Sequence, residues 1–294
     1  MMFERILVAL DGSQLSEAAL PYVAALSGVL GSELILVRAL QAASTTVPVG
    51  PYGLPEVYQE LYDTEEHAAR EYLAHIAAPL QAEGRTVRTM VASGPPASVI
   101  LGAAEEEQAG LIAIATHGRS GLSRFALGSV AEVVLHAANC PLLIVRGARP
   151  SLATLTRILV PLDGTPLAEA GLSLARELAH ALGLEVMLVR VAANSAARAV
   201  AGDYLEQVAA RLRRENLTVT TRVTEGVAAE QVVQVAAAQE ASLIVMATHG
   251  RGGPARWVLG SVAESIVRNA AIPVLVARAT EKATGVAPAP RPVE

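Results

Sequence analysis

An internal repeat is the feature that most constrains the fold of this chain. Residues Leu111 to Glu132 align without a gap on Leu243 to Glu264, and 15 of the 22 positions are identical. Nearer the amino terminus, Ile6 to Ser13 (ILVALDGS) matches Ile158 to Thr165 (ILVPLDGT). A repeat of this length and order indicates that one folding unit was duplicated, so the chain should form two similar domains.

The two copies differ in length. Matching residues are 152 positions apart at Val37 and Val189 but 132 apart at Tyr72 and Tyr204, so the first copy carries 20 additional residues between these points. They include residues 45–55, whose prolines and glycines predict a surface loop that either covers a site or is uncommitted. We place the domains at 1–147 and 156–279 and expect residues 280–294, rich in Ala, Pro and Gly, to form a disordered tail.

Composition excludes several classes of protein. Hydrophobic residues make up 52% of the 294 residues and charged residues 17%, which is unlike a disordered chain. The net charge of -5 predicts neither a nucleic acid nor an anionic membrane surface as a partner. The amino terminus lacks the pattern of a secretion signal, and no apolar stretch is long enough to span a bilayer. With Cys140 as the single cysteine, the expectation is a soluble cytoplasmic protein without disulfides.

Short apolar runs alternate with longer segments of helical period in each copy. In the first copy we expect strands at 5–10, 33–39, 86–91, 111–115 and 141–146, and helices at about 13–30, 61–83, 96–108 and 129–138. Continuously apolar strands are typical of a parallel sheet with helices on both faces. Each copy is therefore predicted to be a doubly wound α/β domain of five parallel strands, which binds its ligand beyond the carboxyl ends of the strands.

Two loops in each copy follow strand ends and would face one another across such a site. The first is Asp11-Gly12-Ser13, matched by Asp163-Gly164-Thr165. Ser13 and Thr165 are good residues to begin a helix, and Pro166 occupies the favoured first helical position in the second copy. Contact with a ligand and simple helix capping are equally supported here, because duplication copies structural residues too.

The second loop carries the repeated motif Ala-Thr-His-Gly-Arg, and nine residues separate its glycine from the Gly128-Ser129 or Gly260-Ser261 that follows. Glycines allow backbone N–H groups to approach an anion, and the helix that begins here adds the positive end of its dipole. Against this, Ser129 to Glu132 and Ser261 to Glu264 fit the capping-box pattern, in which the serine hydroxyl serves the helix instead of a ligand.

These two motifs together, with the nine-residue spacer and the Leu-Gly-Ser-Val-Ala-Glu helix start, resemble the universal stress protein family in a tandem arrangement. The resemblance extends from Phe3 to Ala279. It implies a Rossmann-like domain with strand order 3-2-1-4-5 in each copy, and in one branch of the family a site for ATP or AMP. It also implies that the fifth strands, Leu142 to Val145 and Val274 to Ala277, pair with each other in a pseudo-dimer.

The resemblance and the two loops together give ten candidate ligand-binding residues in each copy. In the first copy they are Asp11, Ser13, Ala39, Ala115, His117, Gly118, Arg119, Gly128, Ser129 and Val130. In the second copy they are Asp163, Thr165, Val191, Ala247, His249, Gly250, Arg251, Gly260, Ser261 and Val262.

One departure from the family pattern concerns its glycines. The nucleotide-binding branch has G-x2-G-x9-G-[ST], and its first glycine falls on Ala115 in one copy and Ala247 in the other. A methyl group there would crowd the nucleotide if the backbone had to approach it closely or adopt a positive φ. The alanines therefore weaken the nucleotide hypothesis without removing it.

Other candidate sites are weaker. His67, Glu71 and His75 share one helical face, but such spacing is usual for a solvated surface, and we expect no metal site. Cys140 matches Ile272 of the other copy and is interpreted as a small buried hydrophobe. Pro21 should kink the first helix, because it cannot donate to the carbonyl of Glu17.

The sequence leaves three functions open. The leading one is a stress-response sensor or regulator that binds ATP or AMP, with Mg²⁺ as an accompanying ion if the ligand is ATP. The second is a protein of the same family that acts through contacts with an unknown protein partner. The third is a slow ATPase, although no G-x4-G-K-[ST] phosphate loop is present and no catalytic residues are assigned. Association of two chains into a homodimer stays undetermined.

Overall fold

The computed structural model describes residues 3–40, 55–116, 127–146, 155–249 and 260–279. In the first half, strands and helices alternate in the order β1 (Arg5–Ala9), η1 (Ser16–Ala19), α1 (Leu20–Leu30), β2 (Glu33–Leu40), α2 (Pro55–Ala82), β3 (Val87–Ser93), α3 (Pro96–Glu106), β4 (Leu111–Thr116), α4 (Ser129–Ala137) and β5 (Leu142–Arg146). In the second half the order is β6 (Arg157–Pro161), α5 (Pro166–Leu182), β7 (Glu185–Ala192), α6 (Ser195–Arg213), β8 (Val219–Glu225), α7 (Ala228–Ala238), β9 (Leu243–His249), α8 (Ser261–Asn269) and β10 (Val274–Ala279). The predicted alternation is confirmed in both halves.

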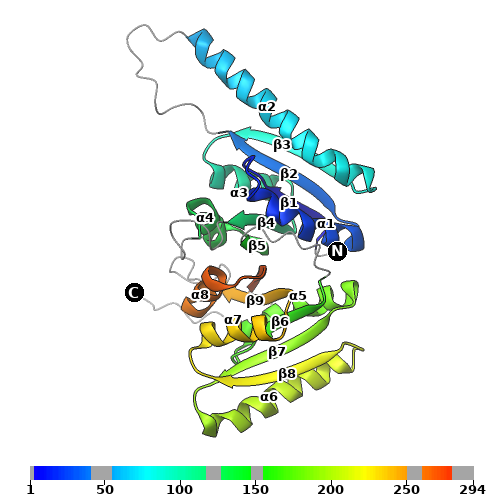
Figure 1. Ribbon diagram of the computed structural model, residues 1–294, viewed down its shortest axis with the longest axis vertical. Coiled ribbons are helices and arrows are strands. Elements are labelled where there is room, and N and C mark those ends of the chain that lie inside the picture. Colours follow the sequence, from blue (N-terminus) through cyan, green and yellow to red (C-terminus); the bar gives the residue numbers. More distant parts are fainter. Residues whose placement is uncertain (1–2, 41–54, 117–126, 147–154, 250–259, 280–294) are drawn as a thin grey trace, which may run out of the picture.

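The ten strands form one continuous sheet in the order β3-β2-β1-β4-β5-β10-β9-β6-β7-β8 (Figure 1). Each half therefore has the order 3-2-1-4-5 with parallel neighbours, as the resemblance implied. The halves join through β5 and β10, which are antiparallel and pair Leu142, Leu143 and Ile144 with Val276, Leu275 and Val274. The antiparallel join means that the carboxyl ends of the strands face opposite edges of the sheet in the two halves.

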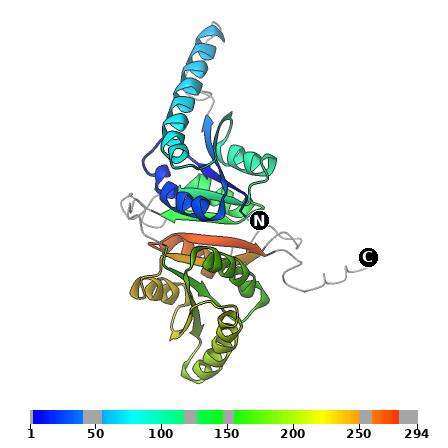
Figure 2. The same cartoon turned by 90° about the vertical axis from the view of Figure 1, so that its right-hand side faces the viewer.

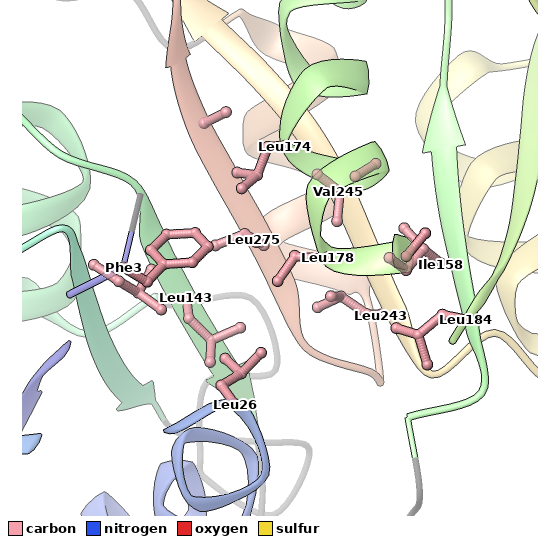
Figure 3. Close-up of a cluster of buried hydrophobic side chains, with 14 of the residues drawn as sticks. Phe3, Leu26, Leu143, Ile158, Leu174, Leu178, Leu184, Leu243, Val245 and Leu275 are labelled. Atoms are coloured by element: carbon pink, nitrogen blue, oxygen red, sulfur yellow. The ribbon is translucent and has the colours of Figure 1, made fainter. Parts of the chain in front are cut away.

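Helices cover both faces of this sheet, because the side chains of each apolar strand alternate between them. One hydrophobic cluster joins the strands to α1, α2, α5 and α6, and the other joins them to α3, α4, α7 and α8. Across the join, Phe3 and Leu26 of the first half lie close to Leu143 and Leu275 (Figure 3). The core is thus shared between the two halves.

The first helical segment departs from the expected kinked helix. A 3-10 turn at Ser16–Ala19 gives way to an α-helix that begins at Leu20, and Pro21 lies in its first turn. A proline is tolerated there because the first N–H groups of a helix have no partner within the helix. The missing donor of Pro21 therefore marks a change of helix type and not a bend within one helix.

Helix α2 is much longer than its counterpart in the second half. It has 28 residues against 19 in α6, and its amino-terminal part projects beyond the body of the first half (Figure 2). Within the residues that the structure describes, no helix is both long and apolar enough to cross a membrane.

Candidate functional site

Each half contains a cavity at the carboxyl ends of its central strands. The cavity of the first half, about 400 Å³, is bordered by the ends of β1, β2 and β4 and by the start of α4. The cavity of the second half, about 330 Å³, is bordered by the equivalent parts of β6, β7, β9 and α8. Both are in the size range of small-molecule sites, and both lie where the strand order reverses.

Most of the described candidate residues are brought together at these cavities. The first is lined by Asp11, Ala39, Ala115, Gly128, Ser129 and Val130. The second is lined by Asp163, Thr165, Val191, Ala247, Gly260, Ser261 and Val262. Ser13 does not line the first cavity, because its side chain turns towards the start of the 3-10 segment, where its hydroxyl accepts from the N–H of Ser16 at 3.2 Å.

The aspartates have the same local geometry in both halves. The Oδ1 atom of Asp11 accepts the N–H of Ser13 at 2.8 Å, and that of Asp163 accepts the N–H of Thr165 at 2.8 Å. Burial alone would raise the pKa of Asp11, but hydrogen bonds from Ser13 and Ser16 outweigh it and hold this pKa below its ordinary value. Asp11 is therefore an ionised hydrogen-bond acceptor at neutral pH.

The two capping predictions had different outcomes. Thr165 caps α5 as expected, since its hydroxyl accepts from the N–H of Ala168 at 3.2 Å. The capping box was wrong: Gly128 and Gly260 are the capping residues of α4 and α8, and no side chain caps either helix. Ser129 and Ser261 are instead the first helical residues, so their hydroxyls are not used for capping.

This arrangement gives each cavity a wall that suits an anion. The first N–H groups of a helix lack partners within the helix and carry its positive dipole end. In both halves these groups and a serine hydroxyl that does not cap the helix border a cavity whose other wall carries a carboxylate. A ligand that combines a hydrogen-bond donor with a phosphate would match both walls.

The comparisons with known proteins decide the family. The model of the universal stress protein family matches this chain twice, over residues 2–146 and 154–278. The chain belongs to the universal stress protein family. Because the model matches once in each half, the sequence repeat corresponds to two universal stress protein units in one chain.

Several universal stress proteins show how far the similarity extends. One from Mycobacterium tuberculosis is 28% identical over 291 residues, which cover 93% of this chain and 96% of that protein. One from Bacillus subtilis is 32% identical over 148 residues, which cover 49% of this chain and all of that protein. The crystal structure of one from Archaeoglobus fulgidus has a TM-score of 0.78 at 23% identity and covers 95% of this chain and 99% of that one, which supports the fold.

The alanines that replace the first motif glycine of some universal stress proteins lie within strands. Ala115 is paired with Val145 in β4 and β5, and Ala247 with Ala277 in β9 and β10. Neither alanine has a positive φ, so the backbone conformation of this strand end does not require glycine. Both pack against the cluster that contains α1 and α5, on the opposite face from α4 and α8.

Sequence reasoning missed a threonine–arginine pair at each strand end. Thr116 and Thr248 line the cavities, are 3% and 2% exposed, and lie beside Arg146 and Arg278 on the neighbouring strands. Arg278 donates to the hydroxyl of Thr248 at 3.1 Å, whereas the hydroxyl of Thr116 has no hydrogen-bond partner among the residues that the structure describes. Both pairs are visible as identities between the copies, but only the strand register shows that each pair is adjacent.

Five candidate residues lie outside the described residues: His117, Gly118, Arg119, Gly250 and Arg251. His249 is the last residue of β9.

The weaker candidates are placed as follows. His67 and Glu71 form an exposed contact of 3.2 Å between successive turns of α2. Within the described ranges, no three His, Cys, Asp or Glu side chains are close enough to hold one metal ion. Cys140 packs against the cluster that contains α3 and α4, and burial raises the pKa of its thiol to about 11.

Proposed function

We propose that each half, 1–147 and 156–279, binds one adenine nucleotide, ATP or AMP, and that the protein acts as a cytoplasmic sensor or regulator in the stress response. The observation that carries this proposal is the pairing of a carboxylate with a helix N-terminus on different walls of one cavity, found in both halves. The resemblance to the nucleotide-binding branch of the family adds the identity of the base.

The carboxylate wall suits the base. Asp11 is an acceptor beside the apolar side chain of Ala39, and Asp163 has the same relation to Val191 in the second cavity. Adenine offers a flat apolar face and an exocyclic amino donor, so it can satisfy both features at once. An ionised Asp11 strengthens such a hydrogen bond.

The helix wall suits the phosphates. The N–H groups at the start of α4 and α8 and the hydroxyls of Ser129 and Ser261 are donors for phosphate oxygens. With ATP, Mg²⁺ would be held chiefly by the phosphates of the ligand. The methyl groups of Ala115 and Ala247 do not oppose this placement, because they pack on the other face of the sheet.

The first experiment is to denature the purified protein, identify any released nucleotide by chromatography and mass, and titrate the stripped protein with ATP and AMP by calorimetry. We expect saturable binding of two nucleotides per chain. Folded protein that releases none and binds neither would refute the proposal and favour the function through protein contacts. ATP consumption at a measurable rate would instead support the slow ATPase.

Charge substitutions locate the phosphates. Val130 and Val262 line the cavities in the first turns of α4 and α8. Val130→Glu should remove one site, Val262→Glu the other, and the double variant both, because a carboxylate there repels phosphate while remaining compatible with a helix N-terminus. Val133→Glu is the matched control, since Val133 is 50% exposed on the same helix and does not line the cavity.

A further inference from the structure

The backbone of the loop that carries Asp11 packs against Arg38 of the neighbouring strand β2. A Cβ atom added to Gly12 would lie 3.1 Å from the Cζ atom and both terminal nitrogens of Arg38. The guanidinium group therefore lies flat against the backbone of the loop. Gly12 also has a φ of +90°, a conformation that favours glycine, and a Cβ atom at this position would press on the guanidinium group of Arg38.

The guanidinium group of Arg38 also lies over an aromatic ring. The ring centroid of Tyr72, on α2, is 5.1 Å from the Cζ atom of Arg38. The Tyr72 hydroxyl in turn donates to Glu17 on the 3-10 segment at 3.0 Å. Tyr72 and Arg38 thus connect α2 and β2 to the Asp11 loop and to the 3-10 segment that follows this loop.

The second half repeats this arrangement. A Cβ atom on Gly164 would lie 3.2 Å from the guanidinium of Arg190, whose Cζ atom is 4.7 Å from the ring centroid of Tyr204. The Tyr204 hydroxyl donates to Glu169 at 3.0 Å. The first half keeps the same geometry although it has 20 more residues between its arginine and its tyrosine.

Stacking, and not charge pairing, holds these arginines. In the part of the chain that the structure describes, neither Arg38 nor Arg190 lies within ion-pair distance of a carboxylate. Both belong to the face of the sheet covered by α1, α2, α5 and α6, and neither lines either of the two cavities described above. A planar guanidinium can fill the space between a ring and a glycine, whereas the ammonium group of lysine cannot.

We infer that Arg38 and Arg190 are positioning residues for the ligand: each fixes the loop that carries Asp11 or Asp163 against a tyrosine and so sets the affinity of its own half. The inference rests on the proposed nucleotide binding. Neither arginine touches the ligand in this arrangement, because each acts through the glycine that follows the aspartate. The two halves therefore serve as controls for each other.

Calorimetry with ATP tests the effect on affinity. Arg38→Met should weaken one of the two sites about five- to tenfold and leave the other unchanged, and Arg190→Met should do the converse. Arg38→Lys keeps the positive charge and much of the side-chain volume but lacks the planar guanidinium group, so it should also weaken the site of the first half. Full affinity in Arg38→Lys would overturn the inference. Arg70→Met is the control, because Arg70 is an exposed residue of α2 that pairs with Glu66.

Amide hydrogen exchange, measured by NMR without nucleotide, separates this inference from the proposed function. The N–H of Ser13 is bound to Asp11 and that of Thr165 to Asp163. Exchange should become several-fold faster at Ser13 alone in both Arg38 variants and at Thr165 alone in Arg190→Met. If the protein shows this exchange pattern but binds no nucleotide, the arginines still position the two loops, and the proposed nucleotide site is refuted. Unchanged exchange in a folded Arg38→Lys protein would refute the positioning role.

Discussion

Gly171 of α5 lies directly against the backbone of the neighbouring strand β9. A Cβ atom there would lie 2.9 Å from the backbone nitrogen of Ala247 and 3.0 Å from the carbonyl carbon of Met246. Both atoms belong to the backbone of β9, which cannot rotate away as a side chain could. Gly171→Ala should therefore force α5 away from the strand that lines the second cavity.

The magnitude follows from two opposing terms. Alanine is favoured over glycine inside a helix by about 1 kcal/mol, while forcing an additional methyl into a packed contact costs about 1–3 kcal/mol. Gly102, in α3, has nothing within 4 Å of its added Cβ atom, so Gly102→Ala carries the first term alone. The free energy of unfolding of Gly171→Ala should thus lie about 1–3 kcal/mol below that of Gly102→Ala.

Urea denaturation followed by circular dichroism measures this difference between the two variants. Equal stabilisation by both alanines would show that α5 does not approach β9 as closely as described. Calorimetry adds a second readout, because the displaced backbone of Ala247 lines only the second cavity. Gly171→Ala should weaken one nucleotide site and leave the other intact.

Three further predictions concern the core, the tyrosines and the cysteine. Leu275→Ala should lower the free energy of unfolding by about 2–5 kcal/mol in urea titrations, because Leu275 is fully buried at the join and pairs with Leu143. Burial and the hydrogen bonds to glutamate raise the pKa of Tyr72 and Tyr204 to about 12 from 10.0. The stability that these two tyrosines contribute should therefore be fully present below pH 10 and be lost between pH 10 and 12, and a double change to Phe should flatten this decline. Because the thiol of Cys140 is protonated at pH 8, iodoacetamide should modify it far more slowly in the native protein than in urea, and equal rates would contradict its burial.

Much of the fold could be predicted because the same alternation of strands and helices occurs twice in the sequence, once in each copy. Continuous apolar strands and helical segments agree between the copies, and local rules place a cap correctly where Thr165 precedes a proline. The capping-box prediction failed at Ser129 because the Ser-x-x-Glu pattern does not fix which residue takes the capping position of the helix. With Gly128 in the capping position, Glu132 lies one residue too far along α4 to complete the box.

The contacts that sequence reasoning missed are all non-local. Thr248 meets Arg278 only because β9 and β10 are neighbours in that register. Arg38 reaches Gly12 because β2 pairs with β1, and it reaches Tyr72 across the inserted residues of the first copy. Periodicity and capping rules describe segments of a few residues, so they contain no information on these distances.

The join between the halves does more than cover two sheet edges, because it completes the helices that border the cavities. The last carbonyl groups of a helix have no partner within it. Arg278 of the second half donates to the carbonyl of Leu135 in the last turn of α4, and Arg146 of the first half donates to the carbonyl of Val267 in the last turn of α8 at 3.3 Å. A cation at this end also complements the helix dipole. Each helix thus begins at the cavity of its own half and ends on an arginine of the other, so both halves are needed to complete either site's supporting helix.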